Sequence, residues 1–94
     1  MNVTIRIPAA LRKFADGHAS VSSAGATVGE ILTDLTDRFP GLGQRICDEE
    51  GAVRRFVKVF LGDEDIRFLQ QLGTPVSDGD ELSIIPAIAG GVAG

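Results

Sequence analysis

One amphipathic helix constrains the fold of this chain more than any other feature. Its apolar residues recur at helical spacing and form a single stripe: Val28, Ile31, Leu32, Leu35 and Phe39. Thr27 can cap the N-terminus with Glu30 three residues later, as in a capping box, and Pro40-Gly41 is predicted to stop the helix. Because only this stripe is apolar, a sheet is needed to cover it, and the expected fold class is a two-layer α+β domain.

Strand patterns lie on both sides of this helix. Alternating apolar and polar residues and turn signals predict five strands, at 2–7, 19–23, 56–61, 64–68 and 81–85. Residues 13–18 are expected to be a polar connection with a turn at Asp16-Gly17, and Gly62-Asp63 is predicted to form a tight turn. Residues 43–51 are interpreted as one short helical turn around Ile46 and a loop. The predicted order is β-β-α-β-β-β, with a hairpin on each side of the helix.

Composition narrows the class of protein. A length of 94 residues with 44% hydrophobic and 23% charged residues predicts one globular domain. A formal charge of −4 argues against nucleic acid as a partner. The single cysteine excludes an internal disulfide framework and a multi-cysteine metal site. No apolar run reaches the roughly 18 residues of a membrane span and no signal peptide is evident, so a cytoplasmic protein without membrane contact is expected.

Few side chains suggest chemistry within the folded part of the chain. Cys47 is followed by Asp48, Glu49 and Glu50, whose charges raise a thiol pKa, so a structural role is expected rather than a reactive one. His18 has no second ligand at metal spacing, and no metal site is predicted. The sequence shows no Ser/His/Asp or Cys/His arrangement that would indicate a catalytic site, so the chain is not expected to be an enzyme.

The C-terminal segment 87–94 is predicted to be an extended flexible tail that follows a folded domain at 1–86. It carries the pair Gly90-Gly91. A glycine-rich terminus is often simply frayed. Alternatively, two glycines without Cβ atoms can pass through a narrow channel and bring a carbonyl close to catalytic groups. The residues alone leave both explanations open.

The last turn and the tail together carry a resemblance. The turn and strand at 78–82 and the ending Pro-Ala-Ile-Ala-Gly-Gly at 86–91 resemble the ThiS/MoaD-type sulfur carriers. Segments 1–8, 55–57 and 63–68 are most similar to the CysO type within that family. The resemblance implies a ubiquitin-like β-grasp fold, with a mixed sheet of roughly four to five strands packed on one main helix.

The resemblance also implies a function. The chain would be a carrier that serves as a co-substrate of separate enzymes and binds no cofactor itself. An adenylating, E1-like enzyme would use ATP to activate the C-terminal glycine, and sulfur would then replace AMP to give a thiocarboxylate. Gly91 would bear that group, and Gly90 would give it access. A biosynthetic enzyme that makes cysteine or another sulfur-containing metabolite would accept the sulfur.

This sequence departs from the family pattern after the second glycine. It continues through Val92, Ala93 and Gly94, so that the Gly91 carboxyl is a peptide carbonyl. One hypothesis is removal of these three residues by a zinc-dependent JAMM-type peptidase, as in some relatives. The other is that Gly94 is activated directly. The branched side chain of Val92 favours cleavage, because a channel shaped for glycine would not admit it readily.

A docking surface for partner enzymes is predicted beside the root of the tail. If Val57 and Val59 face the helix, Lys58 and Phe60 face outward, and Ile85 lies opposite Ile84 in the last strand. The predicted partner-binding residues are Phe60, Lys58, Ile85, Pro86, Ala87, Ile88 and Ala89. In the alternative interpretation, Phe56, Phe60 and Ile85 fill hydrophobic corners of the sheet.

Two other functions remain open from the sequence. The chain could be the small subunit of molybdopterin synthase, which would form a stable complex with a large catalytic subunit. It could also be a ubiquitin-like modifier joined through Gly91 to lysines. As a carrier, it is expected to be a monomer when free.

Overall fold

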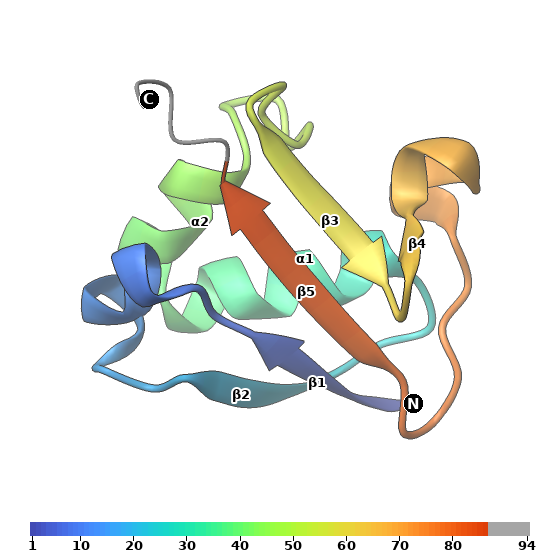
Figure 1. Ribbon diagram of the computed structural model, residues 1–94, viewed down its shortest axis with the longest axis horizontal. Coiled ribbons are helices and arrows are strands. Elements are labelled where there is room, and N and C mark those ends of the chain that lie inside the picture. The colour runs from blue at the N-terminus through green and yellow to red at the C-terminus, as the bar shows by residue number, and fades with distance from the viewer. Residues whose placement is uncertain (87–94) are drawn as a thin grey trace.

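Five strands form one mixed sheet in the computed structural model, which describes residues 1–86. The strands are β1 (Asn2–Arg6), β2 (Ser20–Ala24), β3 (Val57–Leu61), β4 (Glu64–Asp65) and β5 (Glu81–Pro86). Their order is β2-β1-β5-β3-β4, with β5 parallel to β1 in the middle and the other pairs antiparallel (Figure 1). The predicted mixed sheet and both predicted hairpins are confirmed.

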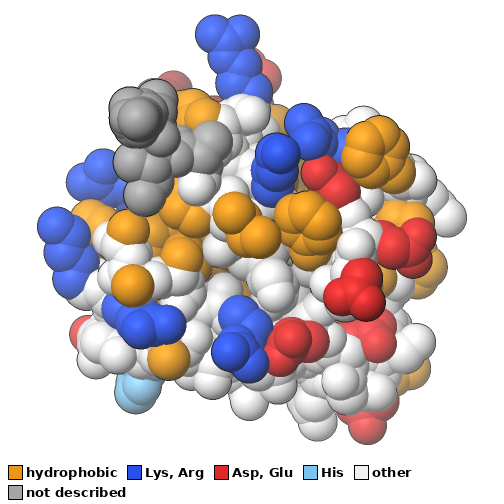
Figure 2. Space-filling view, viewed as in Figure 1, with side chains coloured by type: hydrophobic (Ala, Val, Ile, Leu, Met, Phe, Trp, Pro, Cys, Tyr) orange, Lys and Arg blue, Asp and Glu red, His pale blue; other side chains and the backbone are white. Residues whose placement is uncertain are grey.

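The strand register separates a covered face of the sheet from an open one. On the covered face, Val59 lies opposite Ile84, and both are almost completely buried. On the open face, Lys58 lies opposite Ile85, and both are exposed. The alternation in the sequence therefore gave the correct orientation of β3, and charged and apolar side chains are mixed on the open face (Figure 2).

Helix α1 (Val28–Arg38) lies across the covered face of the sheet (Figure 1). The Thr27 hydroxyl oxygen accepts a hydrogen bond from the Glu30 N–H at 3.2 Å, as the capping box predicts. The Glu30 carboxylate accepts from the N–H of Ala26 at 2.9 Å, one residue before the cap itself. Four of the five predicted stripe residues are buried, and Phe39 packs against them at the C-terminal end of α1.

A second helix, α2 (Pro40–Ile46), includes the short helical turn predicted around Ile46 but begins earlier and is longer. Pro40-Gly41 does end α1, but Pro40 is also the first residue of α2. Proline is well suited to this position, because its fixed φ matches the helix and no N–H is needed there. Leu42 and Ile46 are completely buried or nearly so, and their burial stabilises a helix that contains two glycines.

Three short 3₁₀ helices change other predicted segments. They are η1 (Ala9–Ala15), η2 (Ile66–Phe68) and η3 (Gln71–Gly73). The predicted polar connection at 13–18 begins within η1, and its turn at Asp16-Gly17 is confirmed by φ values of 55° and 83°. The strand predicted at 64–68 was too long. It stops at Asp65, whose carboxylate accepts from the Arg67 N–H at 2.9 Å and caps η2 instead.

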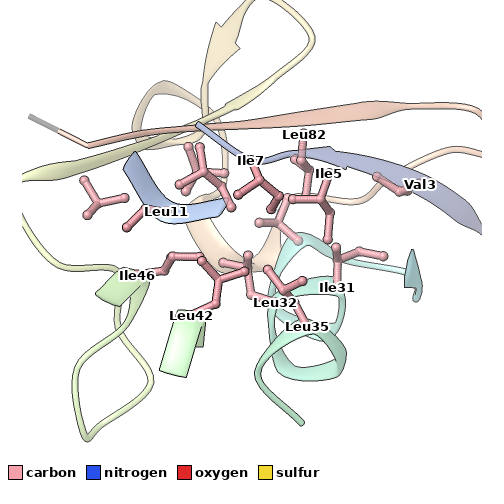
Figure 3. Packing of buried hydrophobic residues seen from close by; sticks show 14 of the residues in the cluster. Val3, Ile5, Ile7, Leu11, Ile31, Leu32, Leu35, Leu42, Ile46 and Leu82 are labelled. Atoms are coloured by element: carbon pink, nitrogen blue, oxygen red, sulfur yellow. The ribbon is translucent and has the colours of Figure 1, made fainter. Parts of the chain in front are cut away.

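The hydrophobic core fills the space between the covered face and the helices (Figure 3). Strands β1 and β5 contribute Ile5 and Leu82, and both side chains have no exposed surface. Helices α1 and α2 contribute Leu35 and Leu42, which are equally buried. Each of these side chains is removed from water completely, a contribution of roughly 1.5–3 kcal/mol before the entropy of ordering is subtracted.

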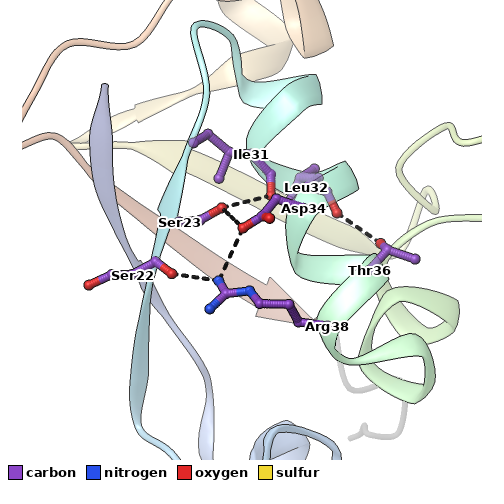
Figure 4. A network of polar contacts seen from close by, with 7 residues as sticks. All are labelled: Ser22, Ser23, Ile31, Leu32, Asp34, Thr36 and Arg38. Atoms are coloured by element: carbon purple, nitrogen blue, oxygen red, sulfur yellow. Dashed lines mark hydrogen bonds and ion pairs between the residues drawn. The ribbon is translucent and has the colours of Figure 1, made fainter.

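A polar network joins α1 to the edge strand β2 (Figure 4). The Ser23 hydroxyl donates to the Asp34 carboxylate at 2.6 Å. Arg38 forms an ion pair with the same carboxylate at 3.2 Å and donates to the main-chain oxygen of Ser22. Because that oxygen lies on the free edge of the sheet, Arg38 occupies one of the acceptors that an unpaired edge offers.

Candidate functional site

Strand β5 leads from the centre of the sheet to the root of the tail. It ends at Pro86, one residue later than predicted, where Pro86 lies opposite Val57 of β3. Val57 donates its N–H to the Arg54 oxygen at 2.9 Å. Proline has no N–H to give to the ladder and fits at this strand end. The described chain therefore stops beside the beginning of β3.

The structure brings together three of the predicted docking residues, Lys58, Phe60 and Ile85, on the open face of the sheet. We call these three residues the docking face. Pro86 follows Ile85 directly but lies opposite Val57, so strand alternation places it on the covered side. Ile85 is 46% exposed, Lys58 is exposed, and Phe60 is partly buried opposite Ser83. Hydrophobic side chains gather over β5 and β3 on this side of the molecule, with charged side chains of both signs around them (Figure 2). An apolar patch with a charged border is typical of a protein interaction surface.

The alternative interpretation has Phe56, Phe60 and Ile85 filling hydrophobic corners of the sheet. Two of these residues do not fit that role. Phe56 is 52% exposed and Ile85 is 46% exposed, so neither is buried at a sheet corner. Phe60 is partly buried, so its burial is compatible with either role.

Two ion pairs lie beside the docking face. Arg6 forms an ion pair with Glu81 at 3.3 Å between β1 and β5. Asp65 lies opposite Phe60 and accepts two hydrogen bonds from the Arg67 guanidinium, at 2.9 and 3.1 Å. These bonds, followed by the one from the Arg67 main-chain N–H, lower the pKa of Asp65. The carboxylate beside Phe60 is therefore held ionised and matched by a cation.

Phe68 is an exposed aromatic residue that the sequence did not single out. It lies in η2 and is 81% exposed, whereas Ile66 in the same turn is 3% exposed. In the predicted strand these two residues would have shared one face, because side chains alternate along a strand. Because Asp65 caps η2 and ends the strand, Ile66 and Phe68 do not share one face. The cap at Asp65 is the sequence signal that would have predicted this difference.

The remaining predicted site residues lie outside the described part of the chain. They are Ala87, Ile88, Ala89, Gly90, Gly91, Val92, Ala93 and Gly94. The predictions for the thiocarboxylate position, for its access and for processing therefore stay predictions.

Cys47, at the C-terminal end of α2, is half-buried. Burial is the main cause that raises the pKa of its thiol. The charge of Asp48 raises it further, and Arg54 opposes both. The predicted direction is confirmed, although burial rather than like charge is the larger cause. A raised pKa keeps the thiol protonated and poorly nucleophilic.

Residues 1–86 contain neither a cluster of metal-ligating side chains nor a helix that could span a membrane. In this part of the chain, no three His, Cys, Asp or Glu side chains are grouped in a way that could hold a metal ion. The helices of the same residues are also too short or too polar to cross a lipid bilayer.

Comparisons with known proteins agree with this geometry. The model of the ThiS family matches residues 5–91. The sulfur carrier protein CysO of Mycobacterium tuberculosis is 43% identical over 93 residues, which covers 97% of this chain and 100% of that protein.

Solved structures show the same fold. CysO in the Amycolatopsis orientalis BexX/CysO complex has a TM-score of 0.87 and 45% identity, with 94% of this chain and 98% of that chain covered. The small archaeal modifier protein 1 of Haloferax volcanii has a TM-score of 0.79 and 27% identity, with 93% and 98% covered. The predicted ubiquitin-like β-grasp fold is confirmed.

Proposed function

The chain belongs to the ThiS family, and on that premise we propose that it is a sulfur carrier of the CysO kind, acted on by separate enzymes rather than catalytic itself. One observation carries the proposal above the others. The similarity to the CysO sulfur carrier extends over the whole of that relative, and the family match ends at Gly91, the second residue of the glycine pair.

The chemistry that this function needs follows from the reactivity of a carboxylate. A free carboxylate is a poor acyl electrophile, because oxide would have to leave. An adenylating, E1-like partner removes this obstacle. The Gly91 carboxylate forms a bond to the α-phosphorus of ATP, pyrophosphate leaves, and an acyl adenylate results. A sulfide or persulfide sulfur then forms the C–S bond as the bond to AMP breaks. After an attack by persulfide, a reducing thiol must also cleave the S–S bond to leave the thiocarboxylate.

Processing must precede activation if Gly91 is the reacting residue. As long as Val92, Ala93 and Gly94 follow it, Gly91 has a peptide carbonyl and no carboxylate to adenylate. We propose that a zinc-dependent JAMM-type peptidase cleaves after Gly91 and that the zinc and the ATP belong to the partners. The stiff, β-branched Val92 supports this order, because it would obstruct a channel that fits glycine.

Partner enzymes would bind the docking face while the tail enters their active site. Ile85 and Phe60 supply apolar surface, and Lys58 supplies a charge beside them. Pro86 ends β5 directly before the tail, so a partner bound on this face would lie beside the reacting end. The complex of the Amycolatopsis CysO with BexX supports binding of a carrier of this shape to another protein. A biosynthetic enzyme that makes cysteine or another sulfur compound would be the second partner.

A second function is favoured by the similarity to the small archaeal modifier protein 1. In that case the activated Gly91 would be joined to lysine amines of other proteins. Isopeptide adducts in the host that disappear when the chain is truncated before Gly91 would support this function. A thiocarboxylate without adducts would support the carrier.

Reconstitution with the host's adenylating enzyme tests the carrier proposal. The chain ending at Gly91 is expected to stimulate release of pyrophosphate from ATP, whereas the full-length chain should do so only after the peptidase is added. A chain ending at Gly90 is the matched control and should remain inactive. Equal pyrophosphate release with the full-length chain, without peptidase, would instead indicate activation of Gly94.

A further inference from the structure

A groove of about 800 Å³ lies between α1, α2, the connection that follows α2 and η3. None of the residues of the docking face lines it. The two helices cover the face of the sheet that is turned away from the docking face (Figure 1). The groove and the docking face are therefore separate surfaces, and nothing in the proposed carrier function uses the groove.

The floor of the groove is apolar. Leu32 of α1, Leu72 of η3 and Cys47 line it. Gly29 and Gly43 also line it and add no side chain that would fill it. The hydroxyls of Thr33 and Thr36 donate to main-chain oxygens of their own helix, at 2.9 and 2.8 Å. The Thr33 and Thr36 hydroxyls therefore have no hydrogen left to donate to a molecule in the groove.

The border of the groove is strongly acidic. Its charged lining residues are Glu30, Asp34, Asp37, Asp48, Glu49 and Arg54. Five carboxylates against one guanidinium give −4, which equals the formal net charge of the whole chain. The chain has 13 acidic and 9 basic residues. The residues that do not line the groove therefore include eight acidic and eight basic side chains. The excess of acidic over basic side chains that line the groove is thus as large as the excess in the whole chain.

Internal contacts leave much of this charge unmatched. Asp34 is paired with Arg38. Asp48 accepts hydrogen bonds from the N–H groups of Glu50 and Ala52, which hold the carboxylate without cancelling its charge. Asp37 and Glu49 are exposed and form neither an ion pair nor a side-chain hydrogen bond within residues 1–86. A cationic partner would find free carboxylates on both sides of the groove.

We propose that this groove is a second protein-docking site, which binds a basic amphipathic helix of a partner protein. Leucine-type side chains of that helix would occupy the apolar floor, and its lysines or arginines would meet Asp37 and Glu49. A helix is favoured over a strand because the main-chain groups of α1 and α2 are bonded within their own helices. An added strand would therefore find no ladder to join, whereas a helix binds through side chains.

This arrangement has a consequence for the carrier. A partner helix in the groove would leave the docking face uncovered, because the two surfaces lie on opposite sides of the sheet. One molecule could be held by the groove while an enzyme acts on its tail. Binding in the groove can be tested without any sulfur chemistry, so its outcome is independent of the proposed function.

The test is an NMR titration of the full-length, isotope-labelled chain with a short synthetic helical peptide. The peptide presents leucines on one face with lysines beside them, and a matched peptide has glutamates in place of the lysines. The basic peptide is expected to give saturable shifts of amides in α1, α2 and residues 47–54, but not of Lys58 or Ile85. Absence of shifts, shifts centred on the docking face, or equal binding of both peptides would overturn the proposal.

Charge-reversal variants distinguish specific binding in the groove from a general attraction to the negative charge of the chain. The variant Asp37→Lys/Glu49→Lys should weaken binding of the basic peptide at least about threefold at low salt. The variant Asp63→Lys/Glu64→Lys makes the same change in net charge outside the groove, at the β3–β4 turn, and should bind as the unchanged protein does. Equal weakening in both variants would contradict a specific site. Amide spectra of both variants verify that the fold is retained.

Discussion

Gly43 of α2 packs so closely against Thr36 of α1 that a Cβ atom at position 43 would lie 2.5 Å from the Thr36 hydroxyl oxygen. Thr36 cannot easily give way, because it is β-branched and its hydroxyl donates to the Leu32 oxygen at 2.8 Å. The absence of a side chain at position 43 is therefore what allows the two helices to approach each other here. Both residues also line the groove.

The change Gly43→Ala is expected to lower the free energy of unfolding by about 1–2 kcal/mol, because the strain of overpacking exceeds the gain in helix propensity. Urea denaturation followed by circular dichroism measures the effect. Gly73→Ala is the control, since a Cβ there meets no atom within 4 Å. That variant should be neutral or slightly stabilised, and an equal loss in both would refute the role of the close contact.

The cap of α1 gives a second stability prediction. Thr27→Ala removes the acceptor for the Glu30 N–H and should cost about 1 kcal/mol of unfolding free energy. Thr33→Ala changes the same residue type at an exposed position within the helix and should stay within about 0.5 kcal/mol of the unchanged protein. Thermal and urea denaturation of both variants distinguish the cap from a general effect of removing threonine.

Asp65 gives a prediction on pH. Its pKa is lowered in the folded state by the bonds from Arg67, so its ionised form stabilises the fold above the unfolded pKa of about 3.9. This contribution is lost as pH falls through the lower, folded pKa. Asp65→Asn should therefore be less stable than the unchanged protein at neutral pH, and the difference should shrink toward acidic pH.

Urea denaturation across that pH range checks the prediction. The control is Asp63→Asn in the exposed β3–β4 turn, where no side-chain hydrogen bond is formed within residues 1–86. A difference between Asp65→Asn and the unchanged protein that stays constant down to acidic pH would show that the charge of Asp65 is not the cause.

Ile85 gives the prediction for the docking face. Ile85→Asp places a charge in the exposed apolar centre and should weaken binding to the adenylating enzyme by about tenfold or more, with little change in stability. Ser20→Asp adds the same charge on the edge strand β2, two strands from β5, and should leave affinity nearly unchanged. Calorimetric titration measures both affinities. Normal binding by Ile85→Asp would show that the partner uses another surface.

The charge change Phe60→Asp is a harder test of the same face, because Phe60 is partly buried. It is expected to weaken the same complex without unfolding the domain. Loss of the cooperative unfolding transition in this variant would indicate a mainly structural role for Phe60.

Much of the fold could be predicted because local and tertiary preferences agree. The apolar stripe of α1 and the alternation in β3 each correspond to one buried face, and Thr27 with Glu30 marks where α1 begins. Helix α2 was predicted only as one short turn, because Pro40, Gly41 and Gly43 signal a break, whereas burial of Leu42 and Ile46 stabilises a longer helix. Tertiary packing outweighed the local signal at this point.

The candidate site was predictable only where it follows strand periodicity. Lys58, Phe60 and Ile85 share one face because alternation and register place them there. The acidic groove was not predictable, since Asp37 and Glu49 come from segments that only the packing of α1 on α2 brings together. In the sequence, the acidic residues after Cys47 signal no more than a solvated segment.

The central claim is that the C-terminal carboxyl of Gly91 becomes a thiocarboxylate. The most direct test is the intact mass of the chain ending at Gly91 after incubation with the host's adenylating enzyme, ATP and a sulfur source. The predicted result is an ATP-dependent increase equal to the replacement of one oxygen atom by sulfur. An unchanged mass, or the same increase on the full-length chain with Val92, Ala93 and Gly94 still attached, would contradict the claim.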